Sequence, residues 1–85
     1  MPAGKQNAEC QIYRDMTVAN IRDETGSDHV TVVFLESARF YRLNRNHPGF
    51  DKAIRSLRKA LEQGRTVKVG LKSLDTDVIC EIRNQ

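Results

Sequence analysis

One helical segment lies between two stretches with the periodicity of β-strands, and this change of period constrains the fold more than any other feature. Apolar residues recur at helical spacing from Phe50 to Leu61, so that they form one stripe along a helix. Asp51 lies in the first turn, where the helix dipole favours a negative charge. Gly64 is suited to end the helix in a left-handed conformation. The sequence therefore predicts a helix that begins at Phe50 and ends at Gly64.

Segments on both sides of this helix show the period of two that is typical of strands. Three such segments precede the helix and two follow it, at residues 16–22, 29–36, 38–43, 66–72 and 77–83. Short polar residues around Gly26 predict a loop between the first two strands. In the last strand Val78, Cys80 and Ile82 alternate with polar residues, which predicts that the Cys80 side chain points into the core.

The element order is therefore β-β-β-α-β-β, which is the order of the OB-fold. That fold is an all-β barrel of five strands with one helix that plugs an end, and closure of the barrel removes exposed sheet edges. The alternative is an open α+β sheet with the helix on one face. A chain of 85 residues is long enough for one domain. We assign this OB-fold domain to residues 10–85 and expect a flexible N-terminal tail at residues 1–9.

The charged residues are distributed unevenly, although the formal net charge is only +3. Residues 1–38 contain three basic and six acidic side chains, residues 39–72 ten basic and two acidic, and residues 73–85 one basic and three acidic. A strongly basic middle segment between acidic flanks favours an acidic ligand. The same lysines and arginines are equally compatible with solvated helix and strand faces.

No group of residues has the spacing of a catalytic or metal site. His29 and His47 are the only histidines, and neither has a second metal ligand at a regular spacing. Ser27 and Asp28 directly precede His29, and neighbouring strand residues point to opposite faces, so these residues do not form a triad. We therefore expect that the protein is not an enzyme and that it uses no metal and no cofactor.

Cys10 and Cys80 lie far apart and form no C-x-x-C pair. A disulfide between them is compatible with the sequence, but two reduced thiols are the expectation. Residues 1–9 are polar and lack the apolar stretch of a secretory signal. The chain is therefore expected in the cytoplasm unless a leader was removed. No apolar run reaches the roughly 20 residues of a membrane-spanning helix, so no membrane insertion is expected.

The segment Pro48-Gly49-Phe50, the helix that ends at Gly64 and the segment Val67-Lys68-Val69 together resemble the B subunits of bacterial toxins built from one A and five B chains. The resemblance is to the subtilase-cytotoxin and typhoid-toxin type, and it extends over about residues 16–82. It implies an OB-fold pentamer that binds cell-surface glycans and catalyses nothing.

In that toxin group, a Tyr-Ser-Asp segment near the N-terminus contacts the sugar. The counterpart in this sequence is Tyr13-Arg14-Asp15, with arginine in place of the serine. The resemblance therefore makes Tyr13 and Asp15 candidate ligand-binding residues.

Two functions are compatible with these observations. The first is a binding module that assembles into a homo-oligomer, a pentamer if it is toxin-B-like, and binds an oligosaccharide or a receptor. The second is an intracellular OB-fold module that binds single-stranded nucleic acid, because such modules combine a positive groove with aromatic side chains on which bases stack. The candidate residues for that groove are Arg39, Tyr41, Arg42, Lys68 and Lys72.

Overall fold

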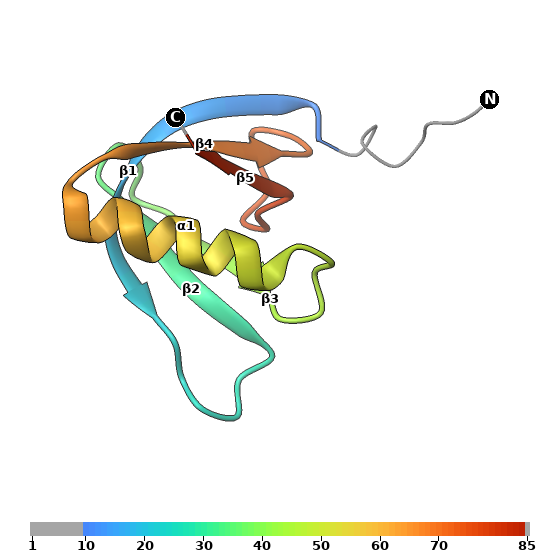
Figure 1. The fold of residues 1–85 in the computed structure, drawn as a ribbon. Coiled ribbons are helices and arrows are strands. Elements are labelled where there is room, and N and C mark those ends of the chain that lie inside the picture. The colour runs from blue at the N-terminus through green and yellow to red at the C-terminus, as the bar shows by residue number, and fades with distance from the viewer. Residues whose placement is uncertain (1–9, 85) are drawn as a thin grey trace.

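The computed structural model describes residues 10–84, so the predicted tail at residues 1–9 lies outside the described residues. The described chain contains five strands and one helix in the predicted order (Figure 1). The elements are β1 (Ile12–Arg22), β2 (His29–Phe34), β3 (Phe40–Asn44), α1 (Phe50–Gln63), β4 (Thr66–Leu71) and β5 (Glu81–Asn84).

The helix α1 has the boundaries and caps that the sequence predicts. It begins after Gly49, has Asp51 in its first turn, and ends at Gly64. Gly64 adopts a left-handed conformation with φ of 67°, and its backbone N–H donates to the carbonyl of Ala60. Glycine adopts this conformation without the steric penalty that a Cβ atom brings, which explains why the helix stops there.

The strands form one antiparallel sheet in the order β3-β2-β1-β4-β5. A register shift between Val18 and Asn20 marks a bulge in β1 where it pairs with β2. The two end strands, β3 and β5, share no ladder, so the sheet is not closed into a barrel. One parallel bridge, between Arg42 of β3 and Val78 ahead of β5, joins the two ends. A five-stranded, mostly antiparallel sheet with one helix is thus confirmed.

The core lies between the curved sheet and α1, which packs against β1, β4 and β5 (Figure 1). The helix contributes the apolar stripe that the sequence predicts, and its inner positions Ala53, Leu57 and Ala60 are buried. The strands contribute alternate residues, as expected for strands with one face toward the core. The buried strand residues are Met16, Val18, Val30, Val32, Phe34, Tyr41, Leu43, Val67, Val69 and Leu71, and Ile79 joins them from the segment ahead of β5.

The first and last strands differ from their predicted bounds. β1 begins at Ile12, four residues before the predicted start, because residues from Ile12 onward pair with β4. β5 begins only at Glu81, because the chain ahead of it pairs with β3 instead: Ile79 donates to the carbonyl of Arg42 at 2.8 Å. This pairing turns Ile79 inward, with 1% of its surface exposed. The prediction that Cys80 points into the core is therefore wrong.

Within residues 10–84, α1 is too short and too polar to cross a bilayer.

Candidate functional site

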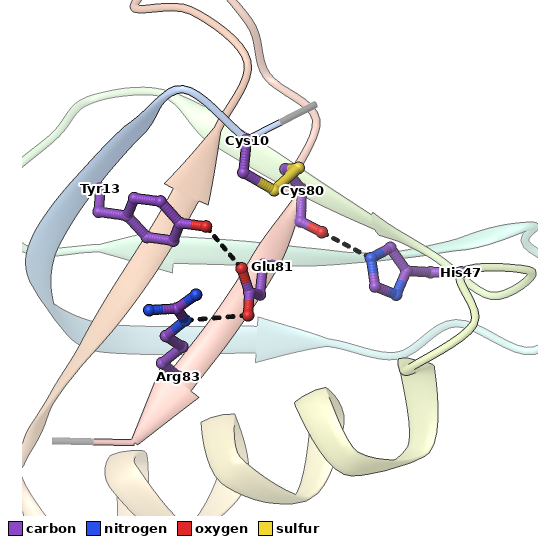
Figure 2. The surroundings of a disulfide bond; sticks show 6 residues. All are labelled: Cys10, Tyr13, His47, Cys80, Glu81 and Arg83. Carbon is purple, nitrogen blue, oxygen red and sulfur yellow. Dashed lines mark hydrogen bonds and ion pairs between the residues drawn. A yellow bond between two sulfur atoms is a disulfide. The ribbon is translucent and has the colours of Figure 1, made fainter. Parts of the chain in front are cut away.

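Tyr13 lies on the outer face of the sheet, in a row that crosses three strands. It is opposite Gly70 of β4, which is opposite Glu81 of β5. The Tyr13 hydroxyl donates to Oε1 of Glu81 at 2.7 Å, and Arg83 Nε donates to Oε2 of the same carboxylate at 2.9 Å (Figure 2). The Arg83 guanidinium also lies 4.8 Å from the centre of the Tyr13 ring, within the range of a cation–π contact.

Gly70 is what allows Tyr13 to lie close to the sheet. A Cβ atom at Gly70 would lie 2.9 Å from Cε2 of Tyr13 and 3.2 Å from Cβ of Glu81. The absence of a side chain therefore makes room for the ring. The hydrogen bond from Tyr13 lowers the pKa of Glu81 and raises the pKa of Tyr13 itself, because the bond is strongest between a neutral phenol and a carboxylate.

Asp15 and Lys68 occupy the next row of the same face, where they are paired in register. Lys68 Nζ lies 3.1 Å from Oδ1 of Asp15; the Asp15 side chain is 59% exposed and the Lys68 side chain 38%. An exposed ion pair of this kind contributes little to stability. The structure thus places Tyr13 and Asp15, which the resemblance indicated, next to Lys68, which came from the predicted basic groove.

A disulfide between Cys10 and Cys80 lies at the end of this face. Its two Cα atoms are 5.8 Å apart, and the expectation of two reduced thiols is therefore wrong. The chain brings the cysteines together because each of them precedes a strand that pairs with β4, one on each side: Gln11 donates to Leu71, and Cys80 donates to Gly70.

His47 connects the loop ahead of α1 to this disulfide. Its Nε2 lies 2.6 Å from the Cys80 carbonyl oxygen (Figure 2), while its Nδ1 accepts the backbone N–H of Gly49 at 3.0 Å. Because Nδ1 accepts a hydrogen bond, it carries no proton. Nε2 faces a carbonyl oxygen and therefore donates, so the ring is the neutral tautomer with its proton on Nε2. His47 therefore has a positioning role, which the sequence did not indicate.

Tyr41, a predicted groove residue, belongs to the core. Only 1% of its surface is exposed, and its ring meets Phe34 edge to face at 5.5 Å between centroids. It cannot stack on a ligand, so that prediction is wrong. The reason is the register of β3, which sets Tyr41 opposite the inward-facing Val32 of β2.

Phe40, the neighbour of Tyr41, takes the outward position instead, with 60% of its surface exposed. The Arg22 guanidinium lies 6.0 Å from the centre of its ring, and Arg42 follows two residues later on the same face. Phe40 was not selected from the sequence. A usable signal was present, because residues two apart in a strand share a face and Arg42 is charged. We call the set Arg22, Thr31, Val33, Phe40 and Arg42 the β2–β3 patch, because pairing places these residues in adjacent rows on the outer face.

The remaining candidates, Arg39 and Lys72, lie elsewhere. Arg39 donates to the backbone carbonyl of Asp75 at 2.8 Å and to Oδ1 of Asp77 at 3.0 Å, so it holds the loop ahead of β5. Lys72 lines a hollow of about 1020 Å³ between the N-terminal half of α1, the loop ahead of it and β5. The five residues predicted to line one groove thus lie in five different surroundings: the core (Tyr41), the β2–β3 patch (Arg42), the row of Asp15 (Lys68), the loop ahead of β5 (Arg39) and the hollow (Lys72).

Several side chains of types that act as catalytic groups in enzymes form structural contacts in this protein. Asp28 Oδ1 lies 2.9 Å from His29 Nδ1, whereas the Ser27 hydroxyl donates to the His29 backbone carbonyl rather than to its ring. In residues 10–84 both cysteines are in the disulfide. The same part of the chain contains no cluster of three or more metal-ligating side chains.

Comparisons with known proteins find a shared fold. No protein-family model matches the chain, and no curated protein matches it. The solved structure of pro-protein-glutaminase matches with a TM-score of 0.72 and 21% identity, over 84% of this chain and 24% of that chain. A mutant form of pro-protein-glutaminase matches with a TM-score of 0.70 and 18% identity over the same shares. This chain therefore spans about a quarter of the length of the proteins that it resembles.

The expectation that the protein is not an enzyme is contradicted by this likeness. Both matching structures are forms of pro-protein-glutaminase, the precursor of an enzyme. At this level of identity the likeness concerns the fold, and a fold can carry many different functions. The resemblance to toxin B subunits, which neither match names, stays a prediction.

Proposed function

We propose that this chain is a binding domain of the OB-fold type, a partly open five-stranded barrel. Two backbone hydrogen bonds support this assignment: Arg42 donates to the Asp77 carbonyl at 2.7 Å, and Ile79 donates to the Arg42 carbonyl at 2.8 Å. They connect β3 in parallel to the segment ahead of β5, at the place where an antiparallel sheet must close to form a barrel. An OB-fold is only partly closed, and its β2–β3 face is a common ligand surface.

The observation that carries the proposal is the exposed aromatic ring of Phe40 next to a row of the sheet that contains two arginines. A ring with 60% of its surface exposed keeps a large apolar area in contact with water, and burying it under a ligand is favourable by about 1.5–3 kcal/mol. Arg22 supplies positive charge beside the ring, and Arg42 adds a second positive charge in the adjacent row of the same face. An apolar platform with flanking cations suits a ligand that has flat apolar faces and negative groups.

Acidic oligosaccharides and single-stranded nucleic acids both meet this description. The disulfide between Cys10 and Cys80 favours the oligosaccharide, because disulfides persist in oxidising compartments outside the cytosol. We therefore propose that the β2–β3 patch binds an acidic oligosaccharide.

Binding to immobilised sialylated and sulfated oligosaccharides, with their neutral parent sugars as controls, tests this function. The wild-type protein is expected to retain acidic sugars and not the neutral ones. Phe40→Ala is expected to weaken binding about tenfold or more, as the loss of a buried aromatic contact predicts. Leu61→Ala is the matched control, because Leu61 is also partly exposed but lies on α1. Equal binding by both variants would exclude the β2–β3 patch as the site.

Single-stranded nucleic acid is the second candidate, supported by the ten basic side chains between residues 39 and 72. A labelled oligonucleotide tested at the same salt concentration distinguishes the two. Nucleic-acid binding falls steeply with rising salt because it releases counterions from the phosphates. Retention of the oligonucleotide, with no retention of any acidic sugar, would replace the oligosaccharide as the proposed ligand.

A further inference from the structure

The hollow between α1 and β5 is a concave surface that shares no residue with the β2–β3 patch. Its volume is about 1020 Å³, at the upper end of the range for small-ligand sites. One wall is the loop ahead of α1 with the first turns of the helix, and the other is β5 with the segment ahead of it. His47 and the disulfide between Cys10 and Cys80 lie in its lining; Figure 2 shows how His47 lies relative to the disulfide.

Both walls are held in place by contacts that do not depend on a ligand. The His47 ring binds the Cys80 carbonyl on one side and the Gly49 backbone N–H on the other. Cys80 is in turn fixed to Cys10 by the disulfide. A site whose walls are already fixed loses little conformational entropy when a ligand enters.

The charges that line the hollow are mostly positive. Lys52, Lys72 and Arg83 are its cationic residues, and Glu81 is its one acidic residue among those described. Glu81 is already satisfied, because it accepts from Tyr13 and from Arg83. No carboxylate in residues 10–84 forms an ion pair with Lys52 or Lys72. Both ammonium groups thus remain available to an anion.

The remaining lining is divided between apolar and neutral polar groups. Apolar side chains come from Ala53, Val78 and Ile82, and hydrogen-bonding side chains from Asn44 and Ser56. We propose that this hollow is a binding site for a small organic anion, with its negative group at Lys52 and Lys72 and its apolar body against the helix and β5. Ligand sites typically combine such an apolar surface with a few polar groups that fix orientation.

Fluorescence titration with anilinonaphthalene sulfonate, an aromatic anion, tests the proposal. The folded protein is expected to bind one molecule of this dye. Lys52→Gln and Lys72→Gln are each expected to weaken binding about tenfold, the loss expected for a hydrogen bond to a charged group. Lys59→Gln is the matched control, since Lys59 lies on the same helix and outside this lining. The neutral dye phenylnaphthylamine is expected to bind all four proteins more weakly and equally.

Amide chemical shifts locate the dye independently of affinity. The largest changes are expected at Asn44, Lys52 and Ile82, whereas Phe40 should not shift. Phe40→Ala is expected to leave dye binding unchanged, so that this site and the β2–β3 patch succeed or fail separately. Equal affinity of the three lysine variants, or shifts confined to residues outside the lining, would overturn the proposal.

Discussion

The disulfide between Cys10 and Cys80 closes a loop that includes almost the whole described chain, because its cysteines are 70 residues apart in sequence. A crosslink stabilises a protein mainly by restricting the unfolded chain, and the effect grows with the logarithm of the loop length. We expect that removal of both cysteines, Cys10→Ala with Cys80→Ala, strongly lowers the free energy of unfolding.

The loop length sets the expected magnitude. A loop of this size corresponds to a loss of about 4 kcal/mol at room temperature in the chain-entropy description. A domain of this length has a total stability of about 4–13 kcal/mol, so the loss is a large share of it. For a small domain, the same loss lowers the melting temperature by about 15–30 °C.

Urea unfolding followed by circular dichroism measures this change, since the chain contains no tryptophan for fluorescence. Adding a reductant should shift the wild-type midpoint toward that of the double variant and leave the double variant unchanged. The slope of free energy against urea should rise as well, because the uncrosslinked unfolded chain exposes more surface. If wild type and variant differ by less than about 1 kcal/mol, the chain-entropy reasoning fails for this protein.

Three further predictions concern the sheet and the assembly. Gly70→Ala should lower stability by about 1–3 kcal/mol, because the new Cβ lies 2.9 Å from the Tyr13 ring. Urea midpoints should show a smaller loss in a Tyr13→Ala background. Hydrogen bonds from the Thr17 backbone and hydroxyl lower the pKa of Glu36 below its ordinary value of 4.5. The Glu36 carboxylate therefore stabilises the fold at pH values above 4.5, and this contribution is lost as the pH falls through the pKa of the folded state. In Glu36→Gln, the free energy of unfolding should decrease less as the pH is lowered over this range. If the chain forms a ring, light scattering should give several times 9.7 kDa; a monomeric mass at high concentration would contradict the ring.

The helix and the element order could be predicted because their signals are local. The stripe from Phe50 to Leu61 and the stop at Gly64 each follow from residues within a few positions. The first half of β1 was missed for the opposite reason. Its residues 12–15 include Arg14 and Asp15 and have little apolar alternation, and they form a strand because β4 supplies the hydrogen-bonding partner.

The candidate site depends on the register between strands and on the meeting of two distant cysteines, and the sequence alone specifies neither. Phe40 and Tyr41 are adjacent aromatic residues, and only the register with β2 decides which one is buried. The disulfide likewise required both cysteines to meet at one end of β4. Tyr13 and Lys68 were identified by type and by resemblance, but the row that links Tyr13 to Glu81 follows from three strands whose order the sequence leaves open.

One backbone bridge joins the two ends of the sheet, and the side chains of Arg39 and His47 add hydrogen bonds between the same two parts of the chain. The backbone groups of Arg42, Asp77 and Ile79 form that bridge, and residues of the loop ahead of α1 and of β5 line the hollow. The sheet therefore closes through an isolated bridge rather than through a continuous ladder of hydrogen bonds. We expect this bridge to open at a lower free-energy cost than any ladder, and its opening would leave all four strand pairings intact. The amide hydrogens of Arg42 and Ile79 should consequently exchange with water before those in the middle of the sheet, and an occupant of the hollow that touches both walls would slow them.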